Sequence, residues 1–222
     1  EASIRALLAA AYDPTRFVIV LAVEERAGPA AAAMAHELQE AYAPRVGGFL
    51  VTVHPDGVSG EARVKGANAT YAAKQVRSWL DARGIAYDRV LLSCFDADTC
   101  ASPEYFACLT YTYLTNPSPT HASYQPVPVY HNNFWDAPAF ARVIEIGSSF
   151  WELIDGMRAE RFVTFSSHSL SFSTLVAIDY WPVDMISDDS AVYWRAFLRY
   201  GGRYRVVPLM ATVSMDIAVG RT

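Results

Sequence analysis

Two aspartates that directly follow an apolar run carry the strongest chemical signal in this sequence. Residues 90–95 (VLLSCF) are mostly apolar, Asp96 comes next, and Asp98 follows after one residue. Such a run predicts a fully buried strand, and open α/β sheets bind ligands at the carboxyl ends of their strands. If the backbone stays extended, both side chains point the same way because a strand has a period of two. Two carboxylates on one side suit a divalent cation that also binds substrate phosphates.

Several kinds of chemistry are compatible with an Asp-x-Asp at a strand end. An aspartyl-phosphate phosphatase would show D-x-D-x-T, but Cys100 occupies the fifth position and no lysine follows Asp98. A nucleotide-sugar transferase would use the pair to hold Mg²⁺ or Mn²⁺ against the donor diphosphate, and a nucleotidyltransferase would use a nucleoside triphosphate. A solvated turn without any chemical role is the most frequent fate of such a triplet.

Two further segments could complete a transferase site. Lys65 opens a predicted helix and is followed by Gly66, which permits close backbone approach, and by Asn68, which offers both a donor and an acceptor. Asp188 and Asp189 begin another predicted helix, whose N-terminus favours ionised carboxylates. A positioned general base there would contribute about 10²–10⁴-fold in rate. The plain alternatives are a surface lysine and two helix-capping aspartates.

Apolar runs that alternate with helical patterns must position these segments. The predicted strands are 16–23, 47–54, 88–95, 124–130 (edge-like, in a proline-rich segment), 162–165 and 204–209. The predicted helices are 4–12, 30–42, 65–82, one that starts at 103, 136–157, 171–178 and 190–200. Strands that alternate with helices predict an α/β fold with a mostly parallel central sheet flanked by helices. No repeat or linker divides the chain, so a single domain is expected.

The composition excludes several classes of protein. The 222 residues are 52% hydrophobic, which is enough for one sizeable core. A net charge of −5 argues against a nucleic acid as partner. No apolar run approaches the roughly 20 residues that span a bilayer, and no signal peptide is recognisable. Three cysteines without C-x-x-C spacing fit neither a disulfide framework nor a zinc site, so a reducing compartment is expected.

The predicted helix over residues 138–157 is rich in aromatic and aliphatic side chains. These side chains could belong to the core, to an interface with a partner, or to a helix that lies on a membrane. The polar side of this helix lacks the Lys and Arg enrichment expected of a membrane-lying helix.

The order of several motifs resembles the inverting family 2 glycosyltransferases with the GT-A fold. The motifs are KGANA (65–69), FDADT (95–99), FSSHSLSF (165–172), DYW (179–181) and ISDDSAVYWRAF (186–197), and their order covers nearly the whole chain. The resemblance implies a GT-A fold and metal-dependent transfer of a sugar. The donor would be a UDP- or GDP-linked sugar, and the acceptor a hydroxyl of a glycan or a lipid.

The resemblance also implies roles for the acidic residues. Asp98 matches the family residue that contacts Mg²⁺ or Mn²⁺ more directly. Asp96 matches the residue nearer the donor ribose and diphosphate, and it would share the metal. Asp189 matches the general base. Asp188 would orient Asp189 or take part in the acceptor site.

Other residues match the substrate-binding parts of the family. Lys65 and Asn68 match a basic-Gly-x-x-Asn segment beside the nucleotide. Glu24 stands where the family usually has Asp-Asp-Gly in contact with the nucleobase, which is a departure. His168 lies in a segment that faces the donor phosphates or the acceptor, and Trp181 resembles a stacking platform for the acceptor sugar.

Two familiar parts of the family are missing from these 222 residues. The family normally begins with a strand that ends in a nucleotide-holding motif, and its processive synthases carry Gln-x-x-Arg-Trp followed by membrane helices. Residues 1–222 are therefore expected to be a catalytic domain truncated at both ends, from a parent anchored at the cytoplasmic face of a membrane. The alternative is a catalytically silent domain of the same fold that binds nucleotide sugars or a partner.

Overall fold

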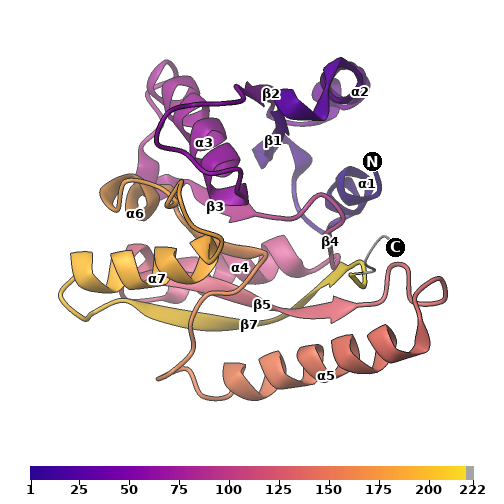
Figure 1. The fold of residues 1–222 in the computed structure, drawn as a ribbon. Coiled ribbons are helices and arrows are strands. Elements are labelled where there is room, and N and C mark those ends of the chain that lie inside the picture. Colours follow the sequence, from indigo (N-terminus) through magenta and orange to yellow (C-terminus); the bar gives the residue numbers. More distant parts are fainter. Residues whose placement is uncertain (219–222) are drawn as a thin grey trace.

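A computed structural model describes residues 1–218, so the last four residues of the predicted domain lie outside the described part. The described chain is an α/β fold with two separate sheets (Figure 1). The strands are β1 (Val18–Glu24), β2 (Gly48–His54), β3 (Leu91–Cys94), β4 (Cys100–Ala101), β5 (Ala122–Tyr130), β6 (His168–Ser171) and β7 (Arg205–Met215). The helices are α1 (Ala2–Leu8), α2 (Pro29–Tyr42), α3 (Lys65–Asp81), α4 (Tyr105–Thr115), α5 (Ala139–Gly156), α6 (Phe172–Ala177) and α7 (Asp188–Arg199).

The predicted α/β class is confirmed, but the expectation of a mostly parallel sheet is wrong for the larger sheet. The smaller sheet is the parallel pair β1–β2, and both α2 and α3 pack on it. The larger sheet has the order β3-β6-β5-β7-β4. Only β5 and β7 run parallel there, while β3–β6, β6–β5 and β7–β4 are antiparallel. Apolar periodicity identifies strands but does not encode the direction in which they pair.

The strand that leads to Asp96 is half-buried instead of fully buried. All four residues of β3 are partly exposed, because β3 lies at the edge of its sheet and pairs only with β6. Strand β1 is likewise an edge strand that pairs only with β2. Within the described residues, each of these two strands therefore has one unpaired edge.

The proline-rich strand β5 lies between β6 and β7, and its predicted edge character holds only after Tyr124. It pairs with β7 along most of its length but with β6 only at Ser123 and Tyr124. Pro126 and Pro128 come after these two residues, where no strand on the β6 side needs their missing N–H groups. The register of the β5–β7 pair shifts between Gln125 and Val127, which accommodates the irregular backbone.

Strand β6, which lies between β3 and β5, is fully buried although it is rich in serine. The predicted strand 162–165 is not formed, and the chain instead enters the sheet at His168. The Ser169 hydroxyl lies 2.6 Å from the Ser93 hydroxyl and 2.8 Å from the Tyr105 hydroxyl. These hydrogen bonds satisfy the polar groups, which makes their burial tolerable.

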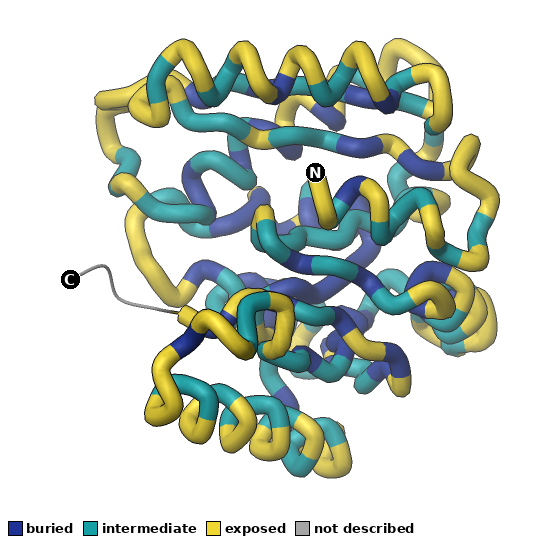
Figure 2. The backbone as a smooth tube through the Cα atoms, turned by 90° about the vertical axis from the view of Figure 1, so that its right-hand side faces the viewer, coloured by how far each residue is buried: buried dark blue, intermediate teal, exposed yellow. Residues whose placement is uncertain are grey.

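Helix α5 lies along the outer side of the larger sheet and packs on β5 (Figure 1). None of its residues is fully buried, as the exposure colouring of Figure 2 makes visible. No helix within residues 1–218 has the length and apolarity that crossing a membrane requires.

The partly buried Glu152 on α5 predicts a dependence of stability on pH. Burial, and next the charge of Asp155, raises the pKa of Glu152 from 4.5 to about 7. The fold therefore favours the protonated carboxyl, whose stabilising contribution is complete below about pH 4.5 and lost as the pH rises through 7. We expect Glu152→Gln to remove part of the loss in melting temperature between pH 5 and pH 8. Thermal unfolding across this range tests the expectation, with the exposed Glu160→Gln as control; equal pH slopes in all three proteins would contradict it.

Candidate functional site

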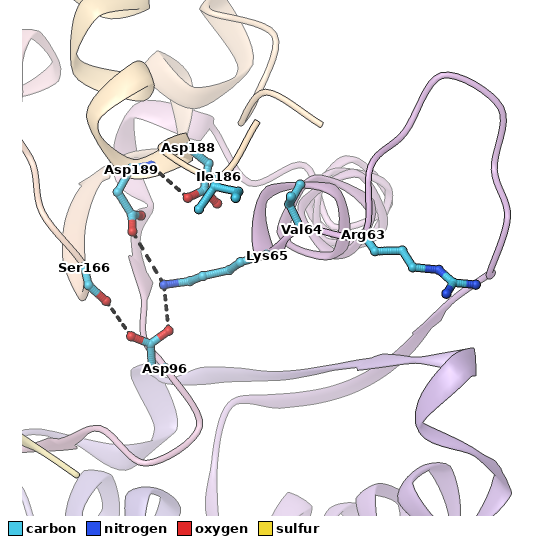
Figure 3. Close-up of a pocket in the computed structure, with 8 residues that line it drawn as sticks. All are labelled: Arg63, Val64, Lys65, Asp96, Ser166, Ile186, Asp188 and Asp189. Atoms are coloured by element: carbon cyan, nitrogen blue, oxygen red, sulfur yellow. Dashed lines mark hydrogen bonds and ion pairs between the residues drawn. The ribbon is translucent and has the colours of Figure 1, made fainter. Parts of the chain in front are cut away.

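The side chain of Lys65 lies between two carboxylates that come from distant parts of the chain. Its Nζ atom is 2.8 Å from Oδ1 of Asp96 and 3.7 Å from Oδ2 of Asp189 (Figure 3). Lys65 is the first residue of α3, Asp96 follows β3, and Asp189 lies in the first turn of α7. The structure thus brings Lys65, Asp96, Asp188 and Asp189 together from these three segments.

These side chains line an open pocket of about 400 Å³. This volume falls within the usual range for small-molecule sites. The lining residues are Arg63, Val64, Lys65, Asp96, Ser166, Ile186, Asp188 and Asp189.

Close packing between the start of α3 and the segment that leads into α7 fixes the shape of the pocket. A Cβ atom added to Gly66 would lie 2.3 Å from the carbonyl oxygen of Pro182 and 3.0 Å from Oδ2 of Asp188. Only glycine fits here, so its predicted role in close backbone approach holds, toward this carbonyl. One turn later, the Thr70 hydroxyl donates to the carbonyl oxygen of Trp181 at 3.0 Å.

The two aspartates of α7 have different environments. Asp188 is buried, and its Oδ1 accepts the backbone N–H of Asp189 at 3.0 Å. Burial, and next the charge of Asp189, raises the pKa of Asp188. The backbone of Asp189 is anchored by the Thr164 hydroxyl, which donates to its carbonyl oxygen at 2.7 Å. Asp188 and Thr164 therefore hold the backbone of Asp189, and both roles predicted for Asp188 stay predictions.

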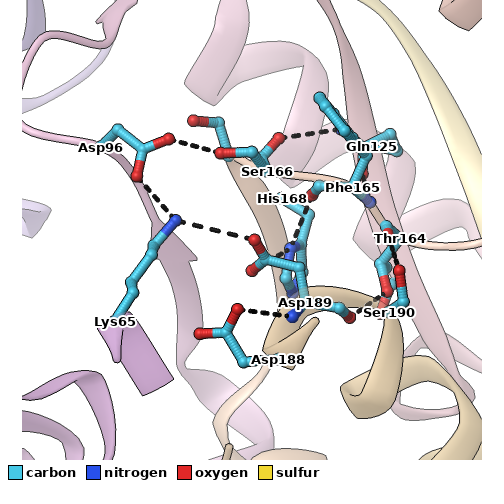
Figure 4. Close-up of polar contacts among 12 residues, drawn as sticks. Lys65, Asp96, Gln125, Thr164, Phe165, Ser166, His168, Asp188, Asp189 and Ser190 are labelled. Atoms are coloured by element: carbon cyan, nitrogen blue, oxygen red, sulfur yellow. Dashed lines mark hydrogen bonds and ion pairs between the residues drawn. The ribbon is translucent and has the colours of Figure 1, made fainter. Parts of the chain in front are cut away.

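The predicted contact of His168 with an acceptor is wrong, because this side chain has no exposed surface. Its Nδ1 lies 3.0 Å from the carbonyl oxygen of Phe165, to which it can donate, and 3.5 Å from Oδ1 of Asp189 (Figure 4). Burial lowers the pKa of His168. A neutral imidazole thus lies behind the Asp189 carboxylate, on the side away from Lys65.

Asp96 and Asp98 do not point the same way. The N–H of Thr99 donates to the carbonyl oxygen of Asp96 at 3.0 Å, so the backbone turns here instead of staying extended. Asp96 binds Lys65 and accepts a hydrogen bond from Ser166, whereas Oδ2 of Asp98 accepts the backbone N–H of Asp216 at 2.9 Å. No group of three or more His, Cys, Asp or Glu side chains in residues 1–218 is arranged to hold a metal ion.

The charges in the pocket stabilise one another. Burial alone would lower the pKa of Lys65, but Cys94, Asp189 and Asp96 together raise it by more. Burial alone would raise the pKa of Asp96, and the charge and hydrogen bond of Lys65 lower it by more. Near neutral pH the pocket therefore holds an ammonium group between two acidic side chains.

Glu24 and Asn68 lie outside this pocket. The Glu24 carboxylate binds the guanidinium of Arg26 through two hydrogen bonds of 2.8 and 2.9 Å. The amide of Asn68 donates to the carbonyl oxygen of Ala22 at 3.0 Å and so ties α3 to β1. Oδ1 of Asn68 is buried and has no hydrogen-bond partner among the described residues.

Trp181 is a core residue, so its predicted role as a stacking platform is wrong. Its side chain is only 2% exposed and packs in the main core cluster, which leaves no open ring face for a sugar. The aromatic character of the DYW motif serves packing between α3, α6 and α7.

The sequence does not predict a role for Ser166, which lines the pocket, or for Gln125, which lies behind Ser166. Ser166 binds Asp96, and its carbonyl oxygen accepts a hydrogen bond of 3.3 Å from the buried Gln125 (Figure 4). Gln125 Oε1 also accepts the backbone N–H of Phe165 at 2.9 Å, so this glutamine holds the loop before β6. The polar run FSSHS, which contains Ser166, could have indicated this residue as a site candidate, whereas no sequence pattern indicates Gln125.

No protein-family model matches the chain, and no curated protein matches it. The inference of function therefore rests on the geometry of the pocket and on the motif order of the sequence.

Proposed function

We propose that this protein is an inverting glycosyltransferase of the GT-A type, which transfers the sugar of a nucleoside diphosphate sugar to an acceptor hydroxyl. The position of Lys65 between Asp96 and Asp189 is the observation that carries the proposal. A cation and carboxylates in one pocket provide both an anchor for a diphosphate and a base for a hydroxyl. The order of the five sequence motifs supports the same reaction.

Asp189 is the general base in this proposal. Its carboxylate oxygens lie 3.7 Å from Lys65 and 3.5 Å from His168. Both separations exceed ordinary hydrogen-bond lengths, so the carboxylate can accept the proton of an acceptor hydroxyl. The deprotonated oxygen attacks the anomeric carbon from the face opposite the leaving diphosphate, so the bond to the diphosphate breaks as the glycosidic bond forms.

Lys65 stabilises the charge that develops on the leaving diphosphate. Its raised pKa keeps it protonated at neutral pH, and it begins a helix whose free N–H groups favour anions. Donors fixed in a partly enclosed pocket stabilise such charge more strongly than water does.

Asp96 and Asp98 stay the proposed ligands of Mg²⁺ or Mn²⁺, although their carboxylates have different partners in this structure, Lys65 and the backbone N–H of Asp216. Mg²⁺ is often held by one or two carboxylates together with substrate phosphates and water, and Asp96 and Asp98 would be these carboxylates. Oδ2 of Asp98 is bonded to a backbone N–H, which leaves Oδ1 as its metal-binding atom. Such an ion would act as a Lewis acid toward the diphosphate.

The proposed function also includes a class of donor, a class of acceptor and a cellular location for the parent protein. The donor is UDP- or GDP-linked, with Asn68 and Glu24 on the nucleotide side, and the acceptor is a glycan or a lipid. A parent anchored at the cytoplasmic face of a membrane stays a prediction.

A catalytically silent nucleotide-sugar-binding domain is the second candidate. The engagement of Glu24 by Arg26 favours it, because this residue would otherwise be free to contact a nucleobase. The two candidates differ in turnover and not in binding.

Both candidate functions require nucleotide binding. Binding of a nucleoside diphosphate in the presence of Mn²⁺ tests this requirement. We expect UDP or GDP to bind by isothermal titration calorimetry, and we expect Asp98→Ala to weaken this binding about 10-fold or more. Contacts to charged groups contribute about 1.5–3 kcal/mol, which corresponds to about 10–100-fold in Kd. The exposed Asp184→Ala is the control. Unchanged affinity in Asp98→Ala would remove the metal role of this residue.

A further inference from the structure

Helix α5 exposes its apolar side to solvent. Phe140 is 77% exposed, Phe150 63%, Trp151 62% and Met157, just after the helix, 81%. The other exposed apolar side chains on and beside α5 are Trp135, Val143, Ile144, Ile146 and Leu153. Aromatic side chains alone present about 150–250 Å² each. The patch therefore exceeds the few hundred Å² that a monomeric protein usually exposes without a function.

The polar side of α5 is turned toward the body of the protein. Helix α5 packs on β5, and burial, followed by the charges of Glu145 and Glu152, raises the pKa of Tyr130 on this strand. The guanidinium of Arg142 lies 5.3 Å from the ring centroid of Phe134, in the turn just before the helix. This orientation is the reverse of an ordinary surface helix, which buries its apolar side. Something outside the described chain must cover the apolar side for this arrangement to be favourable.

The width of the apolar side distinguishes between possible partners. An α-helix has 3.6 residues per turn. When the exposed apolar residues are projected along the helix axis, Leu153 and Ile144 mark the two limits of an arc of about half the circumference. A second helix that pairs with α5 would cover only a narrow stripe of this apolar side. Helix α5 has 18 residues and is about 27 Å long, so pairing with a second copy would bury less than the roughly 800 Å² per partner of a stable interface. A second copy would also leave the flanks of the apolar side exposed.

A flat bilayer surface can cover the whole apolar side. In both Figure 1 and Figure 2, α5 forms the lower boundary of the molecule, so a planar surface can reach it without obstruction. No charged residue lies among the exposed positions of the helix. Arg158 and Arg161 follow its C-terminal end, where they can meet lipid phosphates, and their charge is balanced by the exposed Asp136 and Glu160. This charge pattern suits a phosphate-bearing surface with no net charge.

We propose that α5 docks the protein on a lipid bilayer, lying in the plane of the interface with its apolar half among the headgroups and upper acyl chains. The aromatic residues at 135, 140, 150 and 151 sit at the depth that Trp and Phe favour in membranes. The polar half of the helix needs no headgroups because the body of the protein contacts it.

Flotation with phosphatidylcholine vesicles tests this surface. The wild-type chain should float with the vesicles. The double variant Phe150→Glu/Trp151→Glu should show at least tenfold weaker partitioning, because two carboxylates would have to enter the apolar layer. The matched control is Tyr111→Glu/Leu114→Glu on α4, which places the same charges at two exposed apolar positions elsewhere and should bind like wild type.

Three results would overturn the proposal. The first is failure of the wild-type chain to bind vesicles, with or without anionic lipid. The second is binding that the α5 variant does not weaken. The third is a wild-type dimer in sedimentation equilibrium that the α5 variant dissociates without any effect on vesicles, which would assign the surface to a second copy. Circular dichroism checks that the variants are folded, and the milder Phe150→Ser/Trp151→Ser repeats the test without added charge.

Discussion

Asp189→Asn should lower the rate of sugar transfer by about 10²–10⁴-fold, the usual contribution of a positioned general base. The amide keeps the size of the carboxylate and the backbone bond to Thr164, but it cannot take the proton of an acceptor hydroxyl. Binding of UDP or GDP with Mn²⁺ should stay within a few-fold of wild type, since Asp189 makes no contact with the donor diphosphate in our proposal. Release of the nucleotide diphosphate from candidate donor sugars measures the rate, and calorimetry measures the binding.

The exposed Asp184→Asn is the control for this substitution, because it makes the same chemical change five residues earlier and outside the pocket. Turnover in Asp189→Asn equal to that of Asp184→Asn would exclude Asp189 as the base. Nucleotide binding without turnover by the wild-type chain, on any donor sugar, would favour the silent domain. Absence of nucleotide binding would reject both candidate functions.

The parts of the site that the sequence predicts are those set by local signals. Turn residues and helical periodicity predict Lys65 and Asp189 at helix starts, and the apolar run before Asp96 predicts it at a strand end. The beginnings of two helices and the end of a strand are the places where an α/β fold gathers polar groups, so their convergence could be anticipated.

The parts that could not be predicted depend on packing between distant segments. Because the chain turns at Asp96–Thr99, the Asp98 side chain lies near the end of β7. No local sequence pattern predicts this turn. Trp181 and His168 look equally suited to bind a ligand or to fill a core, and only the three-dimensional arrangement buries them. The direction of strand pairing is also decided by the connections between strands.

Helix α5 illustrates the same limit from another side. Its periodicity predicts the helix with nearly correct ends, at 136–157 against Ala139–Gly156. Periodicity defines an apolar side and a polar side, but it does not say which of them meets the sheet. In this protein the polar side does, which excludes the core among the three alternatives left by the sequence and favours a docking surface.

Gly66→Ala should destabilise the fold by about 1–3 kcal/mol, the usual cost of an extra methyl group in a tightly packed place. The new Cβ would lie 2.3 Å from the carbonyl oxygen of Pro182, and neither this backbone atom nor the buried Asp188 can move without shifting the start of α7. Urea denaturation measures the change as a lower midpoint with an unchanged slope. Because Lys65 and Asp189 lie beside this contact, any surviving folded variant should also bind nucleotide more weakly.

Gly147→Ala is the matched control, since Gly147 is also a helical glycine but an added Cβ there meets no atom within 4 Å. Alanine is the better helix former, so this variant should be more stable than wild type by about 0.5–1 kcal/mol. Opposite signs for the two substitutions would attribute the cost at position 66 to the contact between α3 and the segment leading into α7. A gain in stability at both positions would mean that this contact is loose, and that the pocket owes its shape to the Lys65 ion pairs instead.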